Sequence, residues 1–131
     1  MAYQGETNVI SFQASATITE FQLVKRDSDG YVLPCNSDED VPVGIAQRGA
    51  VSGDQVEVCV GGISFARAGD TLTLGTHQLL MPSDSVAGAL VPYDGTDTNT
   101  QIACAEFIGS SSAAANDQIL VIYRGAVGIQ A

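Results

Sequence analysis

The residues that could support acid–base or nucleophilic catalysis are few. The chain of 131 residues contains one histidine, His77, so any histidine-dependent triad would have to use it. No serine lies in a Gly-x-Ser-x-Gly sequence. The acidic run Asp38-Glu39-Asp40 is typical of a solvated loop, not of a carboxyl pair in which apolar burial raises one pKa. We therefore expect no catalytic activity and interpret His77 as an exposed loop residue.

Metal binding is not predicted either. Residues 27–30 read Asp-Ser-Asp-Gly but lack the third acidic ligand and the closing glutamate of an EF-hand loop. Residues 94–99 (Asp-Gly-Thr-Asp-Thr-Asn) are as rich in turn formers as in oxygen ligands. Cys35, Cys59 and Cys104 lie too far apart for a zinc motif, so we expect free thiols and a reducing site of synthesis. We predict no metal and no cofactor.

The charge of the chain disfavours two classes of partner. Fifteen acidic and five basic residues give a net charge of −10, and the basic residues are scattered along the sequence. Nucleic acids and anionic membranes are bound through clustered lysine and arginine, so neither is an expected partner. No apolar run is long enough to cross a membrane, and the start lacks the basic and apolar regions of a secretory signal.

The elements expected to position these residues are β-strands. No stretch keeps an apolar helical period over three turns, whereas short apolar runs separated by Gly- and Asp-rich turns recur throughout. The pattern predicts an all-β protein with little or no helix, either a compact small β-barrel or a two-sheet β-sandwich. The expected strands cover residues 9–12, 21–24, 31–33, 43–46, 55–60, 63–66, 78–81, 89–91, 102–108 and 119–123.

The strand pattern occurs twice along the chain. A Thr-x-Thr sequence at 17–19 and again at 71–73 is followed in each case by an apolar pair, a Gly-x-x-x-Pro sequence and an Asp-Gln strand. The offset grows from 54 residues at the threonines to 58 at the prolines, as in a duplication with short insertions. Two similar β units closing one core are therefore expected. We predict a single domain over 9–131, with a pseudo-repeat of roughly 9–61 and 62–125.

A longer pattern resembles a family of phage proteins. It runs from Ile-x-Phe-x-Ala at Ile10 through Val-Pro-Val-Gly-Ile-Ala at 41–46 to Gly-Asp-Gln-Val-Glu-Val at 53–58. This is similar to the small capsid decoration (cement) proteins of tailed phages. In the second half residues 74–79 follow the family pattern, but the loop within 81–91 is longer than that pattern leads us to expect.

The resemblance implies a structural virion protein made in the host cytoplasm, not an enzyme. Such a protein would bind the outer surface of the expanded phage head as a homotrimer and clamp adjacent subunits of the major capsid protein. A head-fibre or tail-associated β-barrel module that recognises a host surface glycan remains the alternative. The polar start of the chain is expected to be a flexible arm that contacts the capsid. The arm residues are Met1, Ala2, Tyr3, Gln4, Gly5, Glu6, Thr7 and Asn8.

Overall fold

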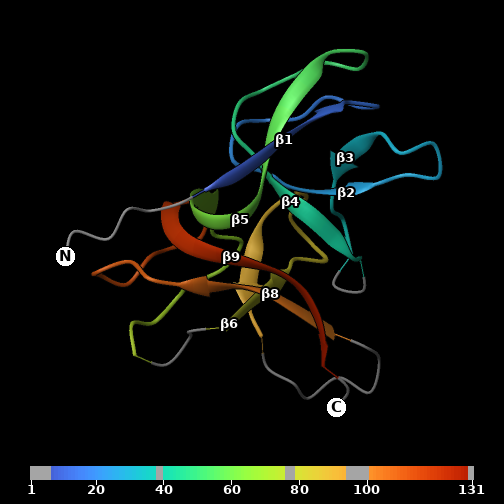
Figure 1. Cartoon of the computed structure of the whole chain (residues 1–131). Coiled ribbons are helices and arrows are strands. Elements are labelled where there is room, and N and C mark those ends of the chain that lie inside the picture. Colours follow the sequence, from blue (N-terminus) through green and yellow to red (C-terminus); the bar gives the residue numbers. More distant parts are fainter. Residues whose placement is uncertain (1–6, 38–39, 76–78, 94–100, 130–131) are drawn as a thin grey trace.

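Strands form the regular structure of the chain. The computed structural model describes residues 7–37, 40–75, 79–93 and 101–129 (Figure 1). These residues contain no helix, and so no helix able to cross a membrane. The strands are β1 (Asn8–Gln13), β2 (Leu23–Arg26), β3 (Val32–Pro34), β4 (Pro42–Ala46), β5 (Gln55–Arg67), β6 (Leu79–Pro82), β7 (Leu90–Pro92), β8 (Gln101–Phe107) and β9 (Gln118–Ile129).

The strands form one continuous sheet. Its order is β3-β2-β4-β5-β9-β8-β6-β7, with β1 added to β5, and every pairing between these strands is antiparallel. The sheet curls strongly and forms a half-barrel (Figure 1). The prediction of an all-β fold is confirmed.

The sequence predicted two strands separated at Gly61-Gly62, and this prediction was wrong. β5 continues through both glycines for 13 residues. Gly61 pairs with Asn8 of β1 and Gly62 pairs with Tyr123 of β9, so the strand changes partners between them. Gly62 has a φ of +106°, which glycine adopts readily because it has no Cβ. The glycines therefore redirect one long strand instead of separating two short ones.

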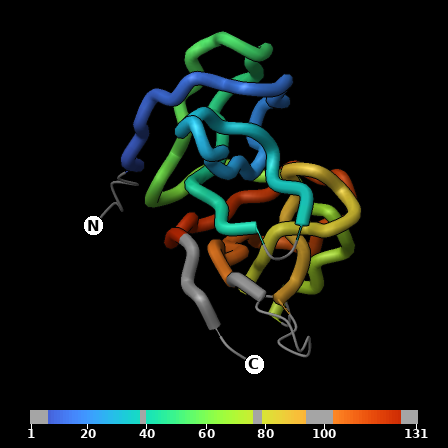
Figure 2. Tube along the Cα trace, turned by 90° about the vertical axis from the view of Figure 1, so that its right-hand side faces the viewer, coloured from blue at the N-terminus to red at the C-terminus, as the bar shows by residue number. Residues whose placement is uncertain are grey.

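The two halves of the chain repeat the same pairings. β5 pairs with β1 and β4 in the first half, and β9 pairs with β5 and β8 in the second. The bridge between Ile18 and Ala50 recurs between Leu72 and Ala113. We call these halves the first and second unit, and β5 belongs to both. Figure 2 shows the blue-to-cyan unit lying above the yellow-to-red unit.

The two Asp-Gln sequences mark equivalent turns. Asp54 and Asp117 each accept a hydrogen bond from the N–H three residues earlier, at 3.3 and 2.9 Å. The residue before each aspartate is left-handed, Gly53 with a φ of +97° and Asn116 with a φ of +74°. Glycine and asparagine tolerate this conformation best, so the local sequence dictates both turns.

The apolar side chains pack in two clusters. One lies within the first unit and includes Ile18, Val24, Val32, Val56 and Val58. The other takes residues from both units, and its members are Leu23, Cys35, Ile45, Cys59, Ala66, Ala68, Leu72, Leu80, Leu90, Cys104, Ala105, Phe107, Ile119, Val121 and Tyr123. The shared cluster makes the core of each unit depend on the other.

A turn of the second unit docks on the first. The N–H of Leu23 donates to the Gly88 carbonyl at 2.8 Å, and the Gly88 N–H donates to the Cys35 carbonyl at 2.7 Å. The Gln22 side-chain amide donates to the Ala87 carbonyl at 3.1 Å. The loop between β6 and β7 is longer than the loop between β2 and β3, in keeping with the long loop noted in the sequence. Its extra length carries the turn onto the neighbouring unit.

We predict that Gly88→Ala destabilises the protein far more than Gly75→Ala. Both glycines are left-handed, with φ of +75° and +84°, so alanine costs about 1 kcal/mol of strain at each. A Cβ at Gly88 would also lie 2.6 Å from Cγ of Gln22, whereas none at Gly75 meets an atom within 4 Å. Chemical denaturation should show a loss of about 2 to 4 kcal/mol for Gly88→Ala. Equal losses for the two variants would show that the docked turn tolerates the extra atom.

Candidate attachment surface

The residues considered for metal binding or catalysis form no such site where the structure describes them. His77, Asp38, Glu39 and residues 94–99 lie outside the described residues. The described ranges contain no group of three His, Cys, Asp or Glu side chains that could hold a metal ion. The carboxylate of Asp27 accepts hydrogen bonds from its own turn, from the N–H groups two and four residues later at 2.9 and 3.0 Å. It is therefore a turn-forming aspartate.

Asp40 differs from the solvated loop acid that the sequence suggested. It forms an ion pair with Lys25 at 3.0 Å and accepts hydrogen bonds from the N–H groups of Asn36 and Ser37 at 2.8 and 3.0 Å. Partial burial alone would raise the pKa of Asp40, but the hydrogen bonds from Asn36 and Lys25 outweigh it, so the pKa lies below its usual value. The sequence interpretation was wrong for this residue, because its partners come from the preceding loop and from β2.

The three cysteines are free thiols, as the sequence predicted, and all three are buried. Burial raises the pKa of the Cys35 thiol to about 12 and also raises the pKa values of Cys59 and Cys104. A thiol in this environment stays protonated at neutral pH and is a poor nucleophile. The cysteines therefore act as small apolar core residues.

We predict that native protein does not react with the thiol reagent DTNB at pH 8, whereas unfolded protein reacts at all three cysteines. Burial both shields the sulfur atoms and keeps them protonated. The absorbance of the released thiolate, with and without guanidinium chloride, measures this directly. Rapid labelling of one thiol in the native protein would contradict the described packing.

The predicted capsid-contacting arm is described only at its end. Residues 1–6 lie outside the described residues. Thr7 donates a hydrogen bond from its hydroxyl to the Ile63 carbonyl at 2.9 Å, and Asn8 begins β1 and pairs with Gly61. These two residues therefore lie against β5, and they lead directly into the edge strand of the first unit.

β1 presents an open edge and exposed apolar side chains. Among the described strands it pairs with β5 alone. Ser11 lies opposite Glu57, whose carbonyl accepts from the Gln47 N–H at 2.8 Å and so points away from β1. In an antiparallel ladder such a pair is not hydrogen-bonded, so the backbone groups of Ser11 face outward. Val9 and Ile10 are 46% and 50% exposed.

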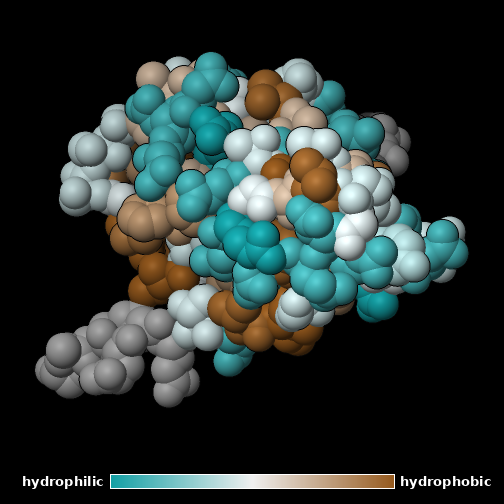
Figure 3. All heavy atoms as spheres, turned by 90° about the horizontal axis from the view of Figure 1, so that it is seen from above, coloured by the Kyte–Doolittle hydropathy of each residue, from teal (hydrophilic) through white to brown (hydrophobic). Residues whose placement is uncertain are grey.

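β1 runs through the upper half of the molecule in Figure 1, beside β5. Seen from above, the surface is largely hydrophilic, with hydrophobic residues gathered along one margin (Figure 3). An exposed strand edge is a ready template for pairing with another chain. We call the outer edge of β1, with Val9 and Ile10, the β1 edge.

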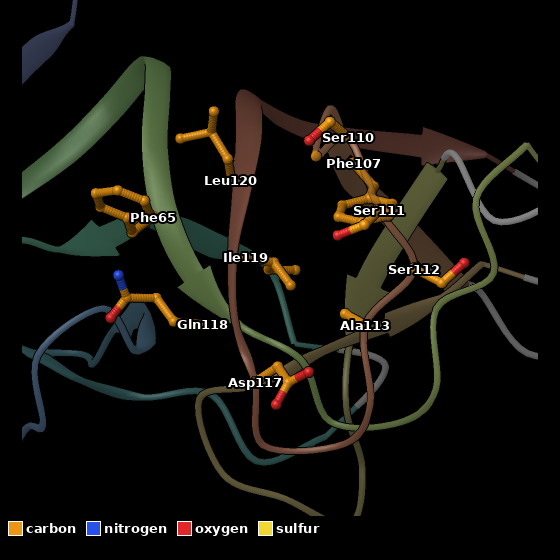
Figure 4. Close-up of a pocket in the computed structure, with 11 residues that line it drawn as sticks. Phe65, Phe107, Ser110, Ser111, Ser112, Ala113, Asp117, Gln118, Ile119 and Leu120 are labelled. Atoms are coloured by element: carbon orange, nitrogen blue, oxygen red, sulfur yellow. The ribbon is translucent and has the colours of Figure 1, made fainter.

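The second unit holds a pocket of about 380 Å³ between β9 and residues 109–113. In Figure 4 residues 109–113 curve around one side of β9, and the side chains of Phe107 and Ile119 lie between the two. Phe65 is 45% exposed and packs on Phe21, with ring centroids 5.4 Å apart. The pocket is lined by Phe65, Phe107, Gly109, Ser110, Ser111, Ser112, Ala113, Asp117, Gln118, Ile119 and Leu120.

Sequence reasoning missed this pocket. The expected strands at 102–108 and 119–123 left residues 109–118 between them, and residues 110–112 do lie outside the strands. The available signal was a difference between the repeats, since the second unit has two more residues than the first between the end of its β4 equivalent and the paired alanine. This difference in length can be recognised only after the two units are aligned residue by residue.

The comparisons with known proteins concern the fold. No protein-family model and no curated protein matches the chain. Among solved structures it is similar to the N base of the head fiber gp8.5 of bacteriophage phi29, with a TM-score of 0.63 and 16% sequence identity. The match covers 93% of this chain and 98% of that one, so both units and the shared strand take part in it.

Proposed function

We propose that the protein is a structural component of a phage virion that attaches to the outer surface of the head, as the base of a head appendage. The observation that carries the proposal is the end-to-end similarity of fold to a head-fiber base. A match to one hairpin or one unit would be common among β proteins. A match that includes both units and their shared strand is less common, and so is stronger support for a related role.

The same similarity favours an appendage base over a cement clamp. Both roles require a compact β protein that binds the capsid shell, so the fold class alone does not separate them. The resemblance to cement proteins rests on framework residues of the repeat, which specify a fold more than a partner. The similar solved structure described above is the base of a head fiber, so the appendage role has the more specific support.

A structural role agrees with the chemistry of the described residues. The thiols are buried and protonated, and Asp27 and Asp40 are engaged in local hydrogen bonds. The net charge of −10 disfavours direct contact with the packaged DNA. The partner we propose is therefore the major capsid protein, on the outside of the shell.

The β1 edge is the proposed contact. An extended capsid segment that pairs with Ser11 and its neighbours would gain main-chain hydrogen bonds, while Val9 and Ile10 would bury apolar surface. Residues 1–8 lead into this edge, so their predicted contact with the capsid fits the same arrangement. The homotrimer and the recognition of a host glycan stay predictions from the sequence.

We expect the purified protein to co-sediment with mature heads assembled without it, and to saturate at a fixed number of copies per head. Heads before and after expansion, incubated in parallel, separate the two candidate roles. A cement clamp requires a strong preference for the expanded lattice, which it stabilises by mass action. An appendage base requires only a site on the mature head, so binding without that preference favours the appendage role. Absence of co-sedimentation with either form of head would overturn the proposal.

We predict that Ser11→Pro weakens head binding about three- to tenfold, because it removes one outward-facing N–H donor. Ser11→Ala is the matched control, since it keeps the N–H and loses only the hydroxyl, which is hydrogen-bonded to the Gln55 side chain. Quantitative co-sedimentation measures the affinity, and chemical denaturation checks that both variants stay folded. Unchanged binding by a folded Ser11→Pro variant would exclude strand addition at this position.

A further inference from the structure

The pocket of the second unit corresponds to an occupied place in the first. In the first unit the Gln47 N–H donates to the Glu57 carbonyl at 2.8 Å, and in the second the Ile108 N–H donates to the Leu120 carbonyl at 3.0 Å. These two hydrogen bonds set the alignment of the units at this point. Glu57 therefore corresponds to Leu120.

An arginine side chain occupies this place in the first unit. Arg48 directly follows Gln47, and its guanidinium donates to the backbone carbonyl of Gln55, to the Glu57 carboxylate at 2.6 Å and to the Gly49 carbonyl at 3.4 Å. The side chain thus spans the gap between the loop and the strand. A planar group with several donors suits two carbonyls and a carboxylate lying close together.

The second unit lacks the equivalent arginine. Glycine stands at position 109, and a Cβ there would lie 2.7 Å from the ring of Phe107. The phenylalanine ring, which corresponds to Ala46 in the first unit, therefore takes the space of the arginine stem. A phenylalanine ring has no donor, so nothing in this exchange replaces the guanidinium.

The carbonyl that would receive a guanidinium faces the pocket. Gln118 lies two residues before Leu120 on β9, so its backbone points the same way as the Leu120 carbonyl, toward residues 109–113 and away from β5. Three serines and Asp117 also line the pocket, although the Ser112 hydroxyl accepts a hydrogen bond from the Leu74 N–H at 2.9 Å and the Asp117 carboxylate accepts one within its own turn. Phe65 supplies an exposed ring, on which a guanidinium plane stacks favourably.

We infer that this pocket binds the side chain of an arginine supplied by a partner polypeptide, in the place that Arg48 fills within the first unit. The net charge of −10 favours a cationic guest. For the identity of the partner the inference rests on the proposed function, which makes it an arginine-bearing segment of a capsid subunit. The preference of the pocket for a guanidinium does not depend on that identity.

The test uses N-acetyl-L-arginine amide as the probe and amide chemical shifts of the whole protein as the readout. Saturable shifts are expected at residues 109–113 and 118–120. The neutral isostere N-acetyl-L-citrulline amide keeps the shape and loses the charge, so it should bind at least severalfold more weakly. Equal binding of citrulline, no saturable shift, or tighter binding of a monosaccharide such as N-acetylglucosamine would overturn the inference.

A gain of affinity provides a sharper test than a loss. Leu120→Glu gives the pocket the carboxylate that Glu57 supplies to Arg48, and it should tighten arginine-probe binding about two- to fivefold. Val51→Glu adds the same charge to an exposed residue of the first unit, 57% accessible, and should leave the affinity unchanged. An equal gain in both variants would mean general attraction to an acidic protein and would overturn the inference.

The double variant Phe107→Ala/Gly109→Arg restores the residue pair of the first unit and should fill the pocket from within. Its spectrum first shows whether it is folded, and the folded protein should no longer bind the probe. Should it fail to fold, the Leu120→Glu and Val51→Glu pair still decides the question. Probe binding without head binding would refute the proposed function alone, and head binding without probe binding would refute this inference alone.

Discussion

The continuity of β5 is the constraint on which the rest of the structure depends. Its first part completes the sheet of the first unit and its second part begins the sheet of the second. Because one strand serves both, the sheets of the two units are continuous, and one of the two apolar clusters takes residues from both units. The direction change at Gly62 sets how the units meet, which allows the Tyr123 hydroxyl to donate to the Pro42 carbonyl at 3.1 Å and the Gly88 turn to reach Leu23.

Features that the two units share form the framework, and features that differ between them suggest function. The aspartate turns and the paired bridges recur because they shape the half-barrel. The exchange of Arg48 for Gly109 opens a pocket in the second unit that is filled in the first. The β1 edge has no counterpart in the second unit, since β5 takes the equivalent place of β1 there. A duplicated fold thus acquires two different surfaces through a few local changes.

Local chemistry determined what could be predicted from the sequence. The strand class, the repeat and the turns at Asp54 and Asp117 follow from side-chain types a few residues apart. The continuity of β5 through Gly61-Gly62 did not, because paired glycines also mark turns and only the change of partner strand decides between the two. The burial of Asp40 beside Lys25 and the pocket beside residues 109–113 depend on which distant segments meet. Contacts between distant segments could not be inferred from the sequence of this one chain.

In the proposed function, the two-unit half-barrel presents the β1 edge to a capsid subunit. Cryo-electron microscopy of mature heads saturated with the protein tests this claim most directly. We expect density for the half-barrel on the outer shell, with β1 continued by a strand of a capsid subunit. Half-barrel density in which the β1 edge faces solvent and another surface holds the shell would contradict it.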